Sequence, residues 1–523
     1  MHGNYVFQLF TGRERGMYPA SPGWPGETEA PWRPLEFPFT AQPGLINDAA
    51  VIQSDEPADF LGLLMTEELL QILVDQTNLY AVKSISRLPN LPHSRINKWK
   101  PVTVKEMKEF LGLYFLTGLV WKPELQLFWK KDTVHETPYF GKVMSRNRFQ
   151  IILRFLHFSD AEDTGADRLY KIRPVLNYLQ DRFQTMFQPG QDISIDEGTL
   201  LWRGRLGFTF CNPLKPIRYG IKSYILCDSA TGYCHSISPY CGQYSSLSNT
   251  VHTLLGSLTG QGYHLYMDNY YNSVGLCNEL LAKNTHVCGT LRLNRGAPVE
   301  IQQATKSNLS LGETIVQHQG KVMVLAWSDN KIVRMLSTFH HNTMGSVSVW
   351  RKSVGGRVTV KKPQCVLDYN NKMNGVDKLD QNLSYYPFAR RSSKWTNKFV
   401  MYMFSIAIFN SFILYQARHP EGNIQAMLGF IEAIVAAWTN KTPPGPLPPD
   451  PRNARLSRHR PENIPATRVK KYPTRVCQVC RSDGKGRRET RHQCGICRVP
   501  MHKDFCFDRF HQRLAHPSAV CPD

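Results

Sequence analysis

Four aspartates, in three stretches that lie far apart in the sequence, are the residues best suited to catalysis. Asp196 and Asp268 each end or follow a run of apolar and aromatic residues, which is typical of a strand that delivers a carboxylate to its carboxyl end. Asp377 and Asp380 stand three residues apart, so on a helix they share one face. A single aspartate after a strand is more often a loop or helix N-cap residue, so the prediction depends on the three stretches meeting.

The chemistry of such a group follows from its charge. Several carboxylates at one point repel each other unless a cation lies between them, and oxygen ligands alone favour a hard divalent ion such as magnesium. Two ions, magnesium or manganese, can hold both the attacking and the leaving oxygen of a phosphoryl displacement. We therefore predict a nuclease or strand-transfer site, with Asp196, Asp268 and Asp377 as ligands and Asp380 as a further ligand or supporting carboxylate.

The elements predicted around the first two aspartates would place them side by side. Three strands, a helix, a fourth strand and a helix are predicted in that order, at 192–196, 219–227, 233–240, 251–258, 263–268 and 274–281. This order matches an RNase H-like α/β core. It puts Asp196 and Asp268 on neighbouring strands, as a shared metal site requires.

Helical patterns flank this core on both sides. Thr66 precedes an apolar run at helical spacing, and Thr103 with Glu106 forms a capping box. The apolar stretch 399–415 falls short of a membrane span and carries polar side chains, so we predict a buried helix and no membrane partner.

Three other segments differ from both patterns. Residues 1–57 are rich in Pro, Gly and aromatic residues without a period, which predicts disorder. Short alternating runs within 294–363 predict a β-rich insertion domain. Residues 441–474 are Pro-rich and then basic, which is typical of a linker; the basic part would serve as a nuclear import signal, a DNA contact or both.

The charge balance points to a polyanionic partner. The chain carries 63 Lys and Arg against 42 Asp and Glu, a formal net charge of +21 with a pI near 9.4. A surplus of this size most often serves nucleic acid, although a basic protein without such a partner is the simpler alternative.

The last 47 residues predict zinc binding. Two Cys-x-x-Cys pairs, Cys477/Cys480 and Cys494/Cys497, lie 13 residues apart and are followed by further possible ligands. In a cross-brace pairing, one ion would be held by Cys477, Cys480, His502 and Cys506. The second would be held by Cys494, Cys497, His511 and one of His516, Cys521 or Asp483. A single ribbon-like site with four ligands is the alternative, and the domain would bind either DNA or protein.

Several motifs together resemble the piggyBac family of cut-and-paste DNA transposases. The resemblance covers roughly residues 60–440 and the cysteine-rich tail. Its main motifs are SIDEG at 194–198, YMDNYYNS at 266–273, DYN at 368–370, MNGVD at 373–377, DQ at 380–381 and LSYY at 383–386. Shorter matches are YFG at 139–141, MSR at 144–146 and RPV at 173–175.

The resemblance implies an RNase H-like catalytic core with a β-rich insertion, flanked by a helical dimerisation and DNA-binding domain and a C-terminal zinc-binding domain. The expected boundaries are a disordered tail 1–57, helical domain 58–190 and 387–440, core 191–293 and 364–386, insertion 294–363, linker 441–474 and zinc domain 475–523. It further implies a nuclear homodimer that acts on double-stranded DNA, at terminal inverted repeats and TTAA targets, through a hairpin end.

Basic residues near these elements are candidate DNA contacts. Around the core strands they are Arg203, Arg205, Lys215, Arg218 and Lys222. Before the apolar helix they are Arg390, Arg391 and Lys394, together with Trp395, which in the family is linked to the flipped base of the hairpin end. A buried tryptophan that starts a helix is the alternative for Trp395.

Two other classes of function compete with an active transposase. One is a domesticated, non-catalytic DNA-binding protein; the intact carboxylates argue against it, and the lack of the family's usual acidic N-terminal tail argues for it. The other is an RNase H-like nuclease without strand transfer, which would cut DNA but not join it.

Overall fold

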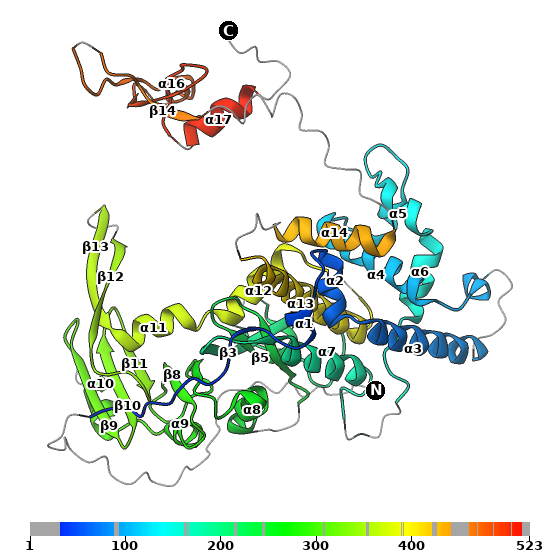
Figure 1. Ribbon diagram of the computed structural model, residues 1–523, viewed down its shortest axis with the longest axis horizontal. Helices are drawn as coiled ribbons and strands as arrows, with labels where there is room; N and C mark the ends of the chain where they lie inside the picture. The colour runs from blue at the N-terminus through cyan, green and yellow to red at the C-terminus, as the bar shows by residue number, and fades with distance from the viewer. Residues whose placement is uncertain are drawn as a thin grey trace, which may run out of the picture. The chain divides into compact units, whose positions relative to one another are not determined.

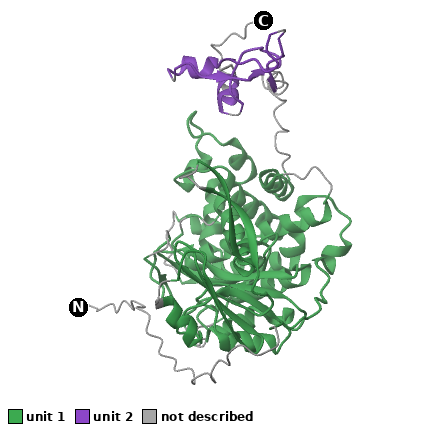
Figure 2. Ribbon diagram, turned by 90° about the vertical axis from the view of Figure 1, so that its left-hand side faces the viewer, with its two compact units in different colours: residues 1–441 green, residues 442–523 purple. Residues whose placement is uncertain are grey.

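The computed structural model describes residues 32–514 apart from 88–93, 162–164, 166, 214–216, 243–245, 307–308, 352–354, 389, 391, 421–425, 441–459, 468, 485 and 504. It divides into two compact units, residues 1–441 and 442–523, and each is considered by itself (Figure 2). Lys215, Arg391, His516 and Cys521 lie outside the described residues.

The first unit is built on a nine-stranded mixed sheet (Figure 1). Its strands are β3 Asp192–Leu201, β4 Phe210–Cys211, β5 Tyr219–Asp228, β6 Cys234–Pro239, β7 His264–Met267, β8 His286–Thr290, β9 Thr314–Gln319, β10 Val322–Ser328 and β11 Ile332–Ser337. They lie in the order β4-β5-β3-β7-β8-β11-β10-β9, with β6 beside β5. The strands β3, β7 and β8 are parallel, and the other pairs are antiparallel.

Helices cover both faces of this sheet (Figure 1). Side chains alternate between the faces of a strand, so Ile193 and Ile195 of β3 point together into one core, against helices α8 Leu247–Leu255 and α9 Val274–Leu281. The other face is covered by α11 Gln364–Lys372 and α12 Gly375–Tyr385. Helix α10 Val299–Lys306 packs on β9 and β10, and the short helix η3 Gly256–Leu258 follows α8.

A helical region is assembled from segments before and after the sheet. Its helices are α1 Asp48–Val51, α2 Pro57–Leu64, α3 Glu67–Ser86, η1 Arg95–Lys98, α4 Val104–Leu119, η2 Leu125–Trp129, α5 Pro138–Val143, α6 Arg146–Phe155, α7 Arg173–Met186, α13 Trp395–Arg418 and α14 Met427–Thr439. The Thr66 and Thr103 hydroxyls cap α3 and α4 by accepting from the third following N–H. Helix α13 packs on α2 and α7, and α14 packs on α2 and α4.

Among the described helices, α13 alone has the length and apolar composition to cross a membrane, and 89% of its most apolar 18-residue window is buried inside the protein. Its burial is that of a core helix, because Phe399, Phe404 and Leu414 lie in the same hydrophobic core as α2 and α7.

The amino-terminal segment differs from the predicted disorder of residues 1–57. From Trp32 onward the chain is described and packs against the sheet: Trp32 stacks on His318 with ring centroids 4.5 Å apart, and Phe39 packs edge-on against Tyr263 at 5.0 Å. Strand β1 Gly44–Leu45 then pairs with β2 Phe187–Gln188. The aromatic residues that interrupt the Pro-rich stretch bury apolar surface, which a solvated tail does not do.

The segment predicted as a separate insertion also differs. Strands β9, β10 and β11 extend the main sheet, because β11 pairs with β8. Only β12 Met344–Arg351 and β13 Gly356–Pro363 form a separate two-stranded hairpin. Alternating runs show that strands exist here but carry no information on which strand they pair with, so the sequence could not separate the two cases.

The second unit is small and contains two short two-stranded sheets. Its elements are β14 Pro461–Asn463, β15 Arg475–Val476, α16 Gln478–Ser482, β16 Glu489–Thr490, β17 His492–Cys494 and α17 Phe505–Leu514. Strand β14 pairs with β17, so residues 461–463 of the predicted linker belong to this unit.

Candidate metal centres and nucleic-acid interface

Two of the predicted catalytic aspartates meet on neighbouring strands of the sheet. Ile195 of β3 lies opposite Met267 of β7 in a parallel pair, so the next residues, Asp196 and Asp268, lie side by side where this pairing ends. Asp268 follows β7, whereas β3 continues beyond the predicted end at Asp196 to Leu201, and Asp196 itself pairs with Ile225 of β5. Both are partly buried. Burial raises the pKa of the Asp268 carboxyl, and the negative charge of Glu197 adds to this shift.

Helix α12 packs on the face of β3 that carries Asp196 and brings Asp380 close to this strand. A Cβ on Gly375 would lie 2.5 Å from the Ser194 hydroxyl, and a Cβ on Gly198 would lie 3.8 Å from a carboxylate oxygen of Asp380. Asp196 falls between Ser194 and Gly198 on the same side of the strand, so it also faces α12. Asp377 lies in the first turn of this helix and is exposed.

The carboxylates are grouped more loosely than the Cys and His ligands of the second unit. Among the described residues, two groups bring three or more Cys, His, Asp or Glu ligand atoms within 4.8 Å of one another. Neither group contains these aspartates. The structure thus places Asp196 and Asp268 on adjacent central strands and Asp377 and Asp380 on the helix that packs over β3. The four carboxylates do not converge on a single point.

Tyr271, which the sequence did not single out, lies near Asp196 and Asp268. The Tyr271 side chain is 1% exposed, and its hydroxyl finds no hydrogen-bond partner among the described residues. The charges of Glu197, Asp196 and Asp268 lie near enough to raise its pKa further beyond the shift that burial causes. A buried hydroxyl that has no protein partner is free to bind an ion or its waters. This hydroxyl and the nearby carboxylates offer oxygen donors alone, and such a donor set fits a hard cation such as magnesium.

Lys222, predicted to contact DNA, is instead buried and paired with Glu197. Its ammonium lies 3.1 Å from Glu197, and the two side chains are 5% and 14% exposed. The rings of Tyr270, Tyr224 and Phe210 surround it at 4.3, 4.6 and 5.1 Å from their centroids. Lys222 therefore neutralises Glu197 within an aromatic cage. The sequence pattern could not predict this burial, because a lysine in a strand is usually exposed to solvent.

The remaining candidate DNA contacts fall into two groups. Arg203, Arg205 and Arg218 lie exposed next to the core strands. Arg390 and Lys394 bind backbone carbonyls instead, of Lys122 and Arg154 respectively, and burial lowers the pKa of both side chains.

Trp395 is the first residue of α13 and is partly buried. Its ring packs edge-on against Phe208, with centroids 5.4 Å apart. The side chain thus has both a packed edge and an accessible part.

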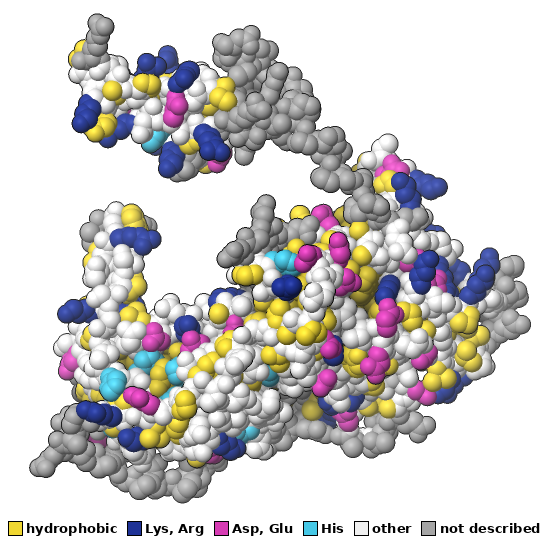
Figure 3. Space-filling model, viewed as in Figure 1, with side chains coloured by type: hydrophobic (Ala, Val, Ile, Leu, Met, Phe, Trp, Pro, Cys, Tyr) yellow, Lys and Arg dark blue, Asp and Glu magenta, His cyan; other side chains and the backbone are white. Residues whose placement is uncertain are grey.

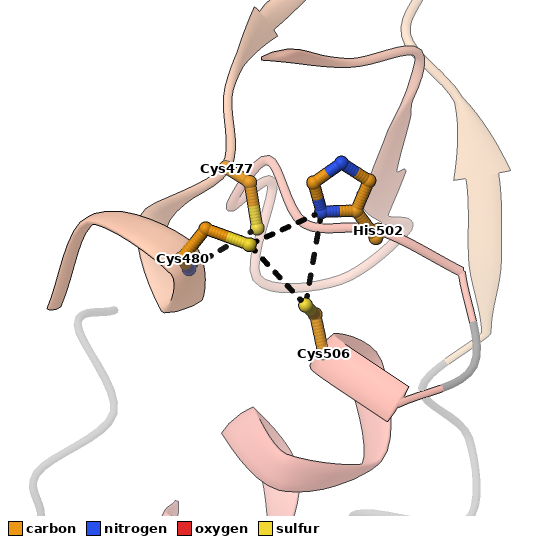
Figure 4. A group of neighbouring side chains, drawn as sticks. All are labelled: Cys477, Cys480, His502 and Cys506. Carbon is orange, nitrogen blue, oxygen red and sulfur yellow. Dashed lines mark hydrogen bonds between the residues drawn. The ribbon is translucent and has the colours of Figure 1, made fainter. Parts of the chain in front are cut away.

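The second unit brings together the two ligand groups paired in the sequence. Figure 4 shows Cys477, Cys480, His502 and Cys506 converging; the Cys480 sulfur lies 3.5 Å from His502 Nδ1 and 3.8 Å from the Cys506 sulfur. The Cys477 sulfur also accepts the Cys480 N–H at 3.5 Å, as thiolates in tight zinc-binding turns do.

The other group consists of Cys494, Cys497 and His511, with the Cys497 sulfur 3.8 Å from His511 Nε2. Of the three candidates for its fourth ligand, Asp483 lies outside the group and forms an ion pair with Arg509 at 3.1 Å. Thiolate and imidazole donors suit zinc, so both groups could hold this ion.

The chain is similar to known proteins over most of its length. A family model described as transposase IS4 matches residues 56–412, so the sheet and its helices form a domain of a transposase family. The chain is 26% identical over 465 residues to human PiggyBac transposable element-derived protein 3, covering 85% of this chain and 74% of that one. It is 25% identical over 410 residues to human PiggyBac transposable element-derived protein 2, covering 74% and 66%.

Among solved structures, a cryo-EM structure of the piggyBac transposase synaptic complex with hairpin DNA matches with a TM-score of 0.65 and 23% identity, over 88% of this chain and 99% of that one. The chain belongs to the piggyBac family of transposases.

Proposed function

We propose that the protein is a cut-and-paste DNA transposase that cleaves and joins DNA strands with two divalent ions. The observation that carries this proposal is that Asp196 and Asp268 lie side by side on adjacent parallel strands, where the pairing of β3 with β7 ends, near the buried hydroxyl of Tyr271. An RNase H-like core is supported by the strand order β6-β5-β3-β7-β8, with β3 antiparallel to β5 and parallel to β7.

In this proposal Asp196 and Asp268 hold the ions, and Asp377 and Asp380 supply further carboxylates from α12. When bound, divalent ions would polarise the scissile phosphate and favour attack by water or a 3′-hydroxyl. Burial of Asp268 and the Lys222–Glu197 pair would keep these carboxylates in place. Exposed Arg203, Arg205 and Arg218 would meet phosphates.

The wider features follow from the family. We propose hairpin end formation, joining to TTAA targets, action in the nucleus and a homodimer that holds two DNA ends. The helical region assembled from segments on both sides of the sheet supports a role in dimerisation and DNA binding. The Cys and His groups of the second unit support a zinc-binding domain with one or two ions.

A domesticated DNA-binding protein without catalysis is the second candidate. It is favoured by the exposed position of Asp377 and by the absence, across the described residues, of three carboxylates within 4.8 Å of each other. The names of the human relatives describe them as derived from a transposable element.

Excision in cells separates the candidates, using inverted repeats found beside related copies in the source genome. Wild type should excise the element without a footprint, Asp268→Ala should abolish excision, and Asp181→Ala, which removes an exposed carboxylate from α7, should excise like wild type. Binding of these ends by wild type without excision would overturn the transposase proposal in favour of the domesticated protein.

A further inference from the structure

The β12–β13 hairpin stands apart from the nine-stranded sheet (Figure 1). Its contacts with the rest of the described chain are concentrated at its base, where Gly345 lies against Leu367 and Gln364 of α11. Lys362 fixes the same end by an ion pair with Asp329 at 3.4 Å and by its position over the Trp327 ring. A lone two-stranded hairpin gains little stability from its own pairing. Its projection from the sheet is therefore better explained by a role in binding than by a role in stability.

The two faces of this ribbon differ. Cross-strand pairs on one face are Trp350 with Arg357, Ser348 with Thr359, and Ser346 with Lys361. All six side chains are exposed, and Trp350 is 67% exposed. The valines of the two strands lie on the opposite face and are half-buried.

The charge of the ribbon is of one sign. Residues 344–363 contain five Lys and Arg and no Asp or Glu. The side chains of Arg357 and Lys361 form no ion pair with any described residue. Figure 3 shows basic, hydrophobic and uncharged side chains along the visible part of the hairpin. Unpaired cations with hydroxyls and an exposed aromatic residue complement a polyanion better than an apolar protein surface.

The dimensions of the hairpin favour duplex DNA as the polyanion. A two-stranded ribbon fits the major groove of double-stranded DNA, which is about 12 Å wide. Each strand has eight residues, and at about 3.3 Å per residue it is about 26 Å long, close to three-quarters of a duplex turn.

We propose that the β12–β13 hairpin docks in the major groove of duplex DNA through its exposed face. Arg357 and Lys361, which both lie on β13, contact phosphates along one side of the groove, and Trp350 of β12 makes apolar contact with base edges. This inference rests on the proposed function as a DNA transposase and adds an interface away from the catalytic aspartates.

The test measures equilibrium binding of the full-length protein to a labelled duplex of mixed sequence over a range of salt concentrations. Each phosphate contact contributes about 0.9 to the slope of log affinity against log salt. Arg357→Gln/Lys361→Gln should therefore lower the slope by about two and weaken binding at least tenfold at low salt. Trp350→Ala should weaken binding about fivefold at an unchanged slope.

The matched control is Lys283→Gln/Lys331→Gln, which removes two exposed cations from other parts of the first unit. It should leave the slope nearly unchanged. Equal slopes for the hairpin double variant and wild type, or an equal loss in the control, would overturn the inference, and wild-type affinity in Trp350→Ala would overturn the groove placement.

Because the readout is binding and not excision, these outcomes do not depend on catalysis. Tight wild-type binding with no effect of the hairpin variants would overturn this inference and leave the proposed function standing. Failure of wild type to bind duplex DNA at all would remove the proposed function with it.

Discussion

Lys222 and Glu197 are a buried ion pair whose partners depend on each other. Lys222→Met should leave Glu197 buried without its cation and lower the free energy of unfolding by about 3 kcal/mol, measured by urea denaturation. Glu197→Gln combined with Lys222→Met should recover most of this loss, because no unpaired charge remains. Lys283→Met, at an exposed lysine, should change stability by less than about 0.5 kcal/mol. An equal loss in all variants would contradict a role for the pair.

His235 makes the fold sensitive to acid. Its ring is 1% exposed and burial lowers the pKa to about 4, so the folded protein keeps it neutral while the unfolded chain protonates it below about pH 6.5. Stability is therefore lost as pH falls from about 6.5 towards 4. Between pH 7 and pH 5 this histidine alone should cost about 2 kcal/mol.

Urea denaturation at pH 7 and pH 5 checks this prediction. His235→Gln, which does not titrate, should lose about 2 kcal/mol less than wild type over that interval. His252→Gln, at a histidine that lies on the surface of α8 with its ring near Glu279, is the control. The same pH dependence in wild type and His235→Gln would show that another group dominates.

At the residue scale, the sequence identified Asp196 and Asp268 by the strands that precede or carry them, and Asp377 and Asp380 by their helical spacing. It did not identify Glu197, Tyr271 or the role of Lys222. Strand position follows from periodicity within a few residues. Whether a lysine pairs inside an aromatic cage depends on side chains from β4, β5 and the loop after β7, which no local pattern brings together.

Helix α12 lies close to β3 because Gly375 has no side chain. Gly375→Ala would place a Cβ 2.5 Å from the Ser194 hydroxyl and should cost about 1–3 kcal/mol in thermal or urea unfolding, with reduced excision because the aspartates of α12 shift. Gly62→Ala, in α2 with open space around its Cβ, should instead stabilise by about 0.5–1 kcal/mol. Stabilisation by both would contradict close packing of α12.

At the element scale, the capped starts of α3 and α4 and the order of core strands followed from local signals, whereas the pairing of β11 with β8 did not. Thr66 and Thr103 act within one helical turn, so sequence suffices. Partner choice among strands is a long-range property, and the aromatic residues that hold 32–45 on the sheet contact positions more than 200 residues away.

For the whole molecule, the two units should differ in their need for metal. A zinc chelator should remove hydrogen-exchange protection from residues 461–514 and leave the sheet of the first unit protected, because a small domain with thiolate and imidazole ligands owes its fold to the ion. Cys480→Ser should have the same effect without chelator. Retained protection in the second unit after complete metal removal would contradict zinc-dependent folding.

The assembly of the first unit from distant segments also fixes when it can fold during synthesis. The apolar face of β5, with Ile221 and Ile225, is covered by α12 and α13, which the ribosome completes about 200 residues later. At about 5–20 residues per second, this face waits for roughly 10–40 s. A nascent chain stopped before residue 375 would leave it uncovered, so prematurely ended transcripts should yield chaperone-bound or aggregated fragments, not a shortened functional protein.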